Sequence, residues 1–217
     1  MDYIQRKLQN SPTITAITCK DGLVIFTEKT LGHIKKNFEN RSNMVFLNKI
    51  NLLAGTGLSQ DFQRIIERAK VDSSAYREKF SSILTGKILA ARISSLVHLQ
   101  TRYWHIRPLC CSIFLASMSI NMPKLFIITH NGYFFNCFSG SLGEKSEMFR
   151  ATIEKLLEGS VKCRKSIEKI YKLYKNAKKN FNFNYLEIAC FSQDNLPFKI
   201  PISCNILLEA NRKAEFD

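Results

Sequence analysis

The order in which strand-like and helix-like segments follow one another limits the possible folds of this chain more than any single motif does. Blocks of short β-branched stretches alternate with blocks of amphipathic stretches whose apolar residues recur at helical spacing. A doubly wound parallel sheet would instead alternate single strands with single helices. The pattern therefore favours an α+β fold in which two antiparallel sheets pack together, with helix pairs outside.

The expected elements differ in length and clarity, and residues 31–42 look irregular. In chain order they are a helix at 2–10, strands at 13–19, 23–29, 44–50 and 51–57, helices at 59–78 and 86–104, strands at 109–117, 124–130 and 133–141, helices at 144–158 and 162–177, a strand at 185–191 and a helix at 202–214.

The N-terminal region carries the clearest local signals. Pro12 holds the residue before it in extended geometry, so the first helix ends there. Two β-branched stretches then flank the tight-turn sequence Lys20-Asp21-Gly22, which predicts a β-hairpin. The apolar stripe of the first helix consists of Tyr3, Ile4 and Leu8.

The length of 217 residues fits a single domain, 1–217. The sequence shows no internal repeat, low-complexity linker or domain boundary. Its most apolar stretch, 109–116, is too short to span a bilayer, and the N-terminus lacks the basic start and apolar core of a signal peptide. We therefore expect no membrane segment and no membrane partner.

The seven cysteines show no CxxC pair, and their neighbours are mostly apolar. This usage is typical of reduced, partly buried thiols in a cytoplasmic or nuclear protein. The four histidines are scattered, and no spacing typical of metal ligands appears. The sequence therefore predicts no metal site and no cofactor.

The formal net charge is +14, with a local cluster of lysines at 162–179. Such a charge fits a nucleic-acid-binding protein, but it also fits a basic subunit of a large assembly with acidic neighbours. Aromatic-basic motifs of RNA-binding domains are missing, which argues against the first interpretation. We expect the lysine cluster to be a solvated helix face.

Three stretches in register resemble the alpha-type subunits of the 20S proteasome. They are "NSPTITAITCKDGLVIFTEK" at 10–29, "RISSLVHLQTRYWHIRPLCCSIFLAS" at 92–117 and "HNGYFFNCFSGSLGEKSEMFRATIEKL" at 130–156, and the resemblance covers residues 2 to about 175. Within the family, they are most similar to the subunit at the seventh ring position.

The resemblance implies a four-layer αββα sandwich and a non-catalytic place in the outer seven-membered alpha ring. Expected partners are the other alpha subunits, the beta ring, and activators or the regulatory particle. The expected locations are the cytoplasm and the nucleus. By the same resemblance, we expect residues 2–10 and 58–80 to contribute to contacts with neighbouring alpha subunits. Because the sequence begins at the first helix, we also expect no gate tail, unless the start of the protein lies upstream.

In the related beta subunits, the nucleophile is an N-terminal threonine whose own α-amino group accepts the hydroxyl proton. An α-amine titrates near neutral pH and can act as a base, whereas an amide inside the chain cannot. Counted back from the turn, the nucleophile position is Pro12, preceded by Ser11 instead of the processing glycine. We therefore interpret Thr13 as an ordinary strand residue and expect no catalytic residue.

The position of the family's activating lysine matches Met44. Glu28 fits the family's acidic position in this count, whereas shifting Thr13 into the catalytic register would place Lys29 there. In alpha subunits the matching lysine pairs with the C-terminal carboxylate of an activator. Met44 thus predicts a weak docking pocket, unless another cation such as Lys49 replaces the lysine; the alternative is that Met44 simply fills apolar space.

Several further residues have structural interpretations. His98 is expected to be packed or hydrogen-bonded, Tyr103 and Trp104 to anchor the end of their helix, Gly143 to form a turn, and Glu144 to be the acidic residue that starts the next helix. Two functional alternatives stay open, an active threonine peptidase of the same fold and a basic nucleic-acid-binding protein.

Overall fold

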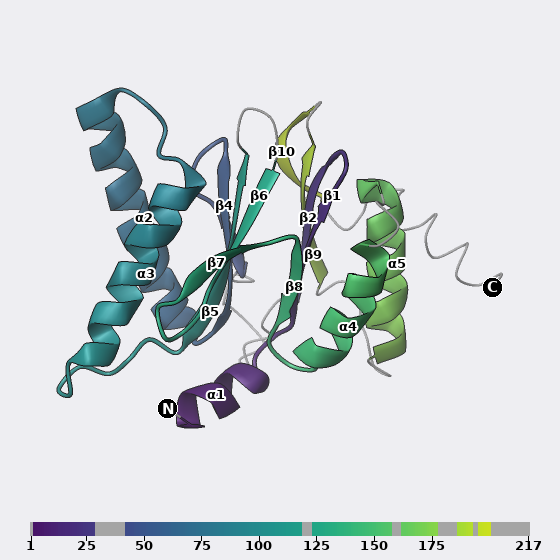
Figure 1. Cartoon of the computed structure of the whole chain (residues 1–217), viewed down its shortest axis with the longest axis horizontal. Coiled ribbons are helices and arrows are strands. Elements are labelled where there is room, and N and C mark those ends of the chain that lie inside the picture. Colours follow the sequence, from purple (N-terminus) through teal and green to yellow (C-terminus); the bar gives the residue numbers. More distant parts are fainter. Residues whose placement is uncertain are drawn as a thin grey trace, which may run out of the picture.

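A computed structural model of the chain describes residues 2–28, 42–118, 123–157, 162–177, 186–192 and 195–200. In this part of the chain, two antiparallel sheets face each other and a pair of helices covers the outer side of each, in four layers (Figure 1). The predicted α+β sandwich is confirmed. None of the described helices is long and apolar enough to cross a membrane.

The first sheet has the strand order β10-β9-β2-β1-β8. Its strands are β1 (Ile14–Cys19), β2 (Gly22–Glu28), β8 (Ser139–Leu142), β9 (Leu186–Ser192) and β10 (Asn195–Ile200). The predicted hairpin forms its centre, with Ile14 opposite Thr27 and Cys19 opposite Gly22. Helices α4 (Ser146–Leu157) and α5 (Cys163–Ala177) cover its outer face.

The second sheet has the strand order β3-β4-β5-β6-β7. Its strands are β3 (Met44–Phe46), β4 (Asn51–Gly57), β5 (Cys111–Met118), β6 (Pro123–Ile128) and β7 (Phe134–Cys137). Helices α2 (Ser59–Phe80) and α3 (Gly86–Arg102) cover its outer face, and α1 (Asp2–Gln9) lies at one end of the sandwich.

Three apolar clusters fill the spaces between the four layers. Residues of α4 and α5 pack on the first sheet around Phe26 and Tyr174, and residues of α2 and α3 pack on the second sheet around Phe62 and Ile93. The third cluster lies between the sheets and includes Phe114. Burial on both faces explains why the central strands are almost continuously apolar instead of alternating.

The strand expected over 133–141 is wrong in one respect, because the structure divides it between the two sheets. β7 pairs with β6, whereas β8 pairs with β1. The chain crosses at Phe138, whose carbonyl oxygen accepts a hydrogen bond from the Thr18 backbone N–H at 2.7 Å. Pattern alone could not separate two strands that follow each other directly but belong to different sheets.

The strand β10 was not predicted. Its sequence contains a proline, which cannot donate to a ladder and lowers the strand signal. The structure places β10 at the edge of its sheet, with a register shift between Asn195 and Phe198, where a proline is tolerated. The helix expected at 202–214 lies outside the described residues.

Element ends also differ from the predictions. The strand expected at 44–50 ends at Phe46, since the Asn48 side chain accepts hydrogen bonds from the backbone N–H groups of Ile50 and Asn51 and closes a turn. Helix α4 begins at Ser146, two residues later than expected. Glu144 therefore precedes the helix, and Glu147 is the acidic residue in its first turn.

Candidate functional site

Pro12, the residue at the predicted nucleophile position, lies where three segments of the sandwich meet. Its carbonyl oxygen accepts a hydrogen bond from the Thr56 hydroxyl of β4 at 2.6 Å. The carbonyl oxygen of the preceding Ser11 accepts one from the Glu144 backbone N–H at 2.9 Å. The segment is thus fixed to both sheets through its backbone, and its peptide links offer no basic amine.

Gly143 closes this position from the side of the loop before α4. Its φ is +98°, and a Cβ there would lie 2.4 Å from the Pro12 carbonyl oxygen. Only glycine adopts this conformation without strain and leaves room for the neighbouring backbone. The predicted turn at Gly143 is confirmed, and its close contact fixes the backbone at Pro12, the predicted nucleophile position.

Thr13 lies immediately before β1 and is fully buried. Its hydroxyl donates a hydrogen bond to the Glu144 carbonyl oxygen at 2.9 Å. Two residues further, the Thr15 hydroxyl and the Tyr174 hydroxyl of α5 are 3.0 Å apart and form a buried hydrogen bond. Burial raises the pKa of Tyr174 well above its usual range, so the phenol stays neutral. These hydroxyls join elements instead of facing a substrate.

Met44 is fully buried in the cluster between the sheets, opposite Ala54 of β4. A thioether at this position supplies no charge to activate a hydroxyl or to pair with a carboxylate. Its burial favours the interpretation that Met44 fills apolar space. The predicted weakness of an activator pocket beside it stays a prediction.

Lys49 lines a different hollow, a cavity of about 470 Å³ at the β3–β4 turn. Two more cations line it, Lys70 and Arg77 of α2, together with the hydroxyl-bearing Ser73 and Ser74. Met44 is not among its lining residues. Three cations and two hydroxyl-bearing residues suit an anionic group, so Lys49 is placed to hold a carboxylate at this cavity, which does not include Met44.

Asp61, in the first turn of α2, joins that helix to the segment before β5. Its side chain is buried, and one oxygen accepts hydrogen bonds from Arg107 Nη1 at 3.0 Å and from the Cys110 backbone N–H at 2.8 Å. The other oxygen is paired with Arg107 Nη2. The carboxylate raises the pKa of Arg107. Arg107 lies in a stretch that resembles alpha subunits, but no local pattern predicts its partner Asp61, 46 residues away.

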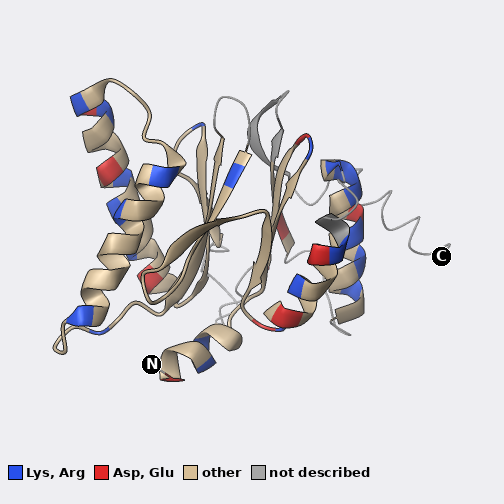
Figure 2. Ribbon diagram, in the orientation of Figure 1, with Lys and Arg blue, Asp and Glu red and all other residues tan. Residues whose placement is uncertain are grey.

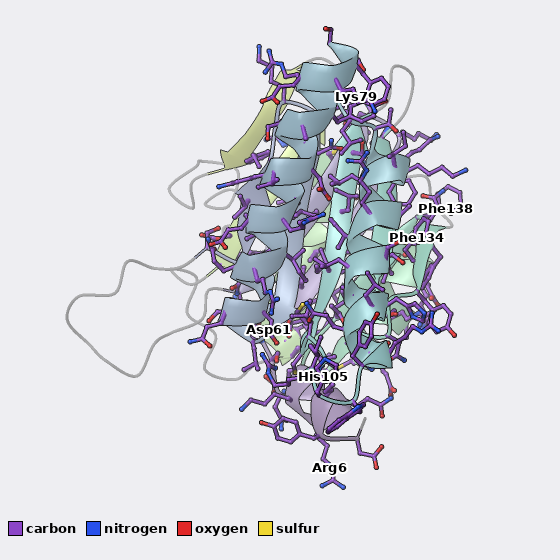
Figure 3. The ribbon with its side chains drawn as sticks, turned by 90° about the vertical axis from the view of Figure 1, so that its left-hand side faces the viewer. Arg6, Asp61, Lys79, His105, Phe134 and Phe138 are labelled. Carbon is purple, nitrogen blue, oxygen red and sulfur yellow. The ribbon has the colours of Figure 1, made fainter. Side chains whose placement is uncertain are left out.

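The end of the molecule that carries α1 exposes several aromatic rings. Figure 3 shows Arg6, Asp61 and His105 at this end and Lys79 at the other. Trp104 is 96% exposed and contacts the His105 ring, and Tyr103 is half exposed, so the prediction that they anchor α3 is wrong. Both residues follow the last turn of α3, where no layer of apolar side chains covers their rings.

Two further predictions on helices are corrected. Tyr3 is 70% exposed, so the buried stripe of α1 consists of Ile4 and Leu8 alone, packed with Cys110. His98 is exposed on α3 instead of packed, although a Cβ on Gly132 would lie 2.7 Å from the His98 Cβ.

The lysines of α5 lie on the side of the helix away from the sheet (Figure 2). The buried side consists of residues at helical spacing that belong to the first apolar cluster: Ile167, Ile170, Tyr171 and Tyr174. The prediction of a solvated basic face is confirmed for the described part of the run, 162–177.

The structure brings together cysteines that sequence spacing did not connect. The six described cysteines are reduced, and five of them are buried, as predicted. Burial raises the pKa of Cys137 to about 12. One group stands out, because the ligand atoms of Cys19, Asp21 and Cys163 all lie within 4.8 Å of one another. Asp21 and Cys163 are 142 residues apart, so no local sequence motif predicts this group.

Comparison with known proteins gives a consistent result. A family model described as "Proteasome subunit" matches residues 8–191. A proteasome subunit alpha type-3 from Oryza sativa is 31% identical over 174 residues, which cover 80% of this chain and 70% of the relative. Relatives of the same name from Spinacia oleracea and Drosophila melanogaster are both 28% identical, covering 99% and 84% of this chain and 87% and 74% of the relatives.

Proposed function

The chain belongs to the proteasome subunit family as an alpha-type member most similar to alpha type-3, and we propose that it is a non-catalytic subunit of an outer alpha ring of the 20S core. Alpha type-3 is the animal name of the seventh ring position. In this role the chain contributes to assembly of the core, to its pore and to the docking of activators in ubiquitin-dependent protein degradation.

The observation that carries the proposal is the chemistry at Pro12. The nucleophile position has no hydroxyl, its nitrogen lies in a peptide bond, and Met44 stands in place of the activating lysine. The Thr13 hydroxyl is buried and donates to the Glu144 carbonyl oxygen, and the Thr56 hydroxyl donates to the Pro12 carbonyl oxygen. A general base alone contributes about 10²- to 10⁴-fold in rate, so these groups do not support the alternative of an active threonine peptidase.

Contacts with neighbouring subunits are proposed at α1 and α2. Exposed apolar residues occur on or beside both helices, including Tyr3, Val71 and Phe80. Obligate interfaces are more apolar than ordinary surfaces and commonly bury more than about 2,000 Å². The proposed partners are other alpha subunits in the ring, the beta ring and activators, and the proposed locations are the cytoplasm and the nucleus.

The excess positive charge also bears on partners. Cations are spread over α2, α3 and α5 instead of forming a single groove (Figure 2). Nucleic-acid binders concentrate such charge along one face and read bases through aromatic or polar side chains. A basic subunit among acidic neighbours therefore explains the charge better than an RNA-binding function does.

Purification of the chain from its own cells under native conditions tests the proposal. We expect it to elute as part of a particle that contains other proteasome subunits, and imaging to show a barrel of four rings with the chain in an outer ring. A chain found as a monomer, or in an inner ring with its N-terminus processed, contradicts the proposal.

A further inference from the structure

We propose that Cys19, Asp21, Cys163 and Cys190 form a zinc site that ties α5 to the first sheet. The four residues come from separate elements. Cys19 ends β1, Asp21 lies in the β1–β2 turn, Cys163 begins α5, and Cys190 lies on β9. The proposed site does not include Pro12. Zinc binding is a property that does not follow from membership of the proteasome subunit family.

The distances suit a four-coordinate ion. The ligand atoms of Cys19, Asp21 and Cys163 lie within 4.8 Å of one another. The Cys163 thiol also lies close enough to the thiols of Cys19 and Cys190 for both to affect its pKa. In a tetrahedral zinc site, bonds of about 2.3 Å to sulfur and 2.0–2.2 Å to oxygen place neighbouring ligand atoms roughly 3.5–3.8 Å apart. Small side-chain rotations therefore bring Cys19, Asp21 and Cys163 to ligand distance, and Cys190, which lies outside this 4.8 Å group, completes the site by turning its thiol inward.

The ligand types select a metal. Three thiolates are soft ligands that favour Zn²⁺ over Mg²⁺ or Ca²⁺, and a carboxylate oxygen is a known fourth ligand for zinc. The three thiols are nearly buried, with 6–9% of each residue exposed, whereas Asp21 is partly exposed. An ion can thus enter from the turn side and then be held in a dry environment.

Groups around the cluster hold the ligands in place. The Cys163 backbone N–H donates to Asp21 Oδ1 at 2.8 Å, which holds the carboxylate beside the Cys163 thiol. The Ser166 hydroxyl oxygen lies 3.2 Å from Cys19 Sγ, and it can donate to the sulfur once that thiol is ionised. Cys163 is the first residue of α5, so the start of this helix fixes its position. Such outer partners orient metal ligands.

Binding is balanced by proton release. Each cysteine that coordinates Zn²⁺ loses its thiol proton to solvent, and Asp21 binds as the carboxylate, so three protons leave for one ion bound. The bound site carries two net negative charges. Lys162 lies close enough to interact with Asp21 and offsets part of that charge.

The test is a metal titration of the full chain. Protein stripped with a chelator is titrated with Zn²⁺ against a chromophoric competitor, and with Co²⁺ as a spectroscopic substitute. We expect one equivalent of tight binding, and Co²⁺ spectra with thiolate-to-metal charge transfer and the intense bands of a tetrahedral site. Absence of stoichiometric binding, or spectra of an octahedral oxygen site, overturns the proposal.

Variants locate the site. Cys163→Ser and Asp21→Asn should each weaken Zn²⁺ binding by at least about 100-fold, and Ser166→Ala by about 10- to 100-fold. Cys137→Ser, which removes a thiol in the other sheet, should leave the affinity unchanged. Equal losses in Cys137→Ser and Cys163→Ser overturn the proposal, as does a Cys19–Cys163 disulfide in protein purified under reducing conditions. Asp21→Asn keeps the side-chain shape, so circular dichroism of the apo forms separates lost binding from lost folding.

Discussion

At the scale of single residues, one buried hydrogen bond joins the start of the first strand to the last described helix. Tyr174 is fully buried, and its hydroxyl lies 3.0 Å from that of Thr15 and 3.5 Å from the Thr13 carbonyl oxygen. Tyr174 also contacts the rings of Phe26 and Phe149. The residue therefore combines apolar packing with a polar link to the backbone next to Pro12, the predicted nucleophile position.

Removing the phenol oxygen should destabilise the chain. Tyr174→Phe keeps the ring but leaves the Thr15 hydroxyl without this partner in a buried place, which costs about 1–3 kcal/mol in the free energy of unfolding. Urea unfolding measures it. Tyr3→Phe, on an exposed ring, should change stability by less than about 0.5 kcal/mol. In the double variant Tyr174→Phe with Thr15→Val, the loss of unfolding free energy should be smaller than the sum of the two single losses. A loss equal to that sum would contradict the hydrogen bond between the two hydroxyls.

The same tyrosine predicts a dependence of stability on alkaline pH. Burial raises the pKa of Tyr174 in the folded state, while the unfolded residue titrates near pH 10. Its contribution is therefore complete below about pH 10 and falls as pH rises further, by up to about 1.4 kcal/mol per pH unit. Unfolding free energies of the wild type should decline more steeply than those of Tyr174→Phe above pH 10. If the unfolding free energies of the two proteins declined in parallel above pH 10, the pKa of Tyr174 would not be raised in the folded state.

At the scale of elements, sequence patterns predicted the helices and central strands but not where the chain changes sheets. The β-branched hairpin around Asp21 and the apolar stripe of α5 carry strong local signals, and both are confirmed. The crossing at Phe138 has no signal of its own, because β7 and β8 are told apart only by their partners. The proline in β10 weakened the strand signal, so this edge strand, which pairs with β9, was not predicted.

The Asp61–Arg107 pair gives a prediction at this scale, because it ties α2 to the segment before β5. Arg107→Ala removes the cation from the buried Asp61 carboxylate and leaves it the hydrogen bond from the Cys110 backbone N–H, so it should cost about 1–3 kcal/mol in unfolding free energy. Arg68→Ala breaks the exposed pair with Asp72 on the same helix and should cost less than about 0.5 kcal/mol. Equal losses in thermal or urea unfolding would contradict this account.

At the scale of the whole molecule, the alternating blocks of strands and helices predicted two packed antiparallel sheets with helix pairs outside, and the resemblance to proteasome alpha subunits added the four-layer arrangement. Pro12 was placed at the nucleophile position by counting from the Lys20-Asp21-Gly22 turn and Met44 by the resemblance, and both assignments stay predictions. The group around Cys163 could not be predicted, since its members meet only when α5 packs on the first sheet. The exposure of Trp104 was also missed, because helical periodicity does not say which end of a helix lacks a covering layer.

Trp104 predicts a separation between folding and assembly. Its ring is 96% exposed, so Trp104→Ala should change the stability of the chain by less than about 0.5 kcal/mol. If this end meets a neighbouring subunit, an aromatic contact there contributes about 2 kcal/mol or more, and the variant should enter particles less well than the wild type in competition. Arg150→Ala, on the exposed side of α4, is the control. Equal incorporation of the wild type, Trp104→Ala and Arg150→Ala into particles would exclude Trp104 from an interface.

The most direct measurement exposes the assembled particle, purified from its own cells, to a threonine-directed epoxyketone probe and identifies every labelled chain by mass spectrometry. The account predicts label on other subunits and none on this polypeptide, whose nucleophile position is Pro12 inside an intact chain. Label on this polypeptide, at Thr13 or at any newly exposed N-terminus, would contradict the account.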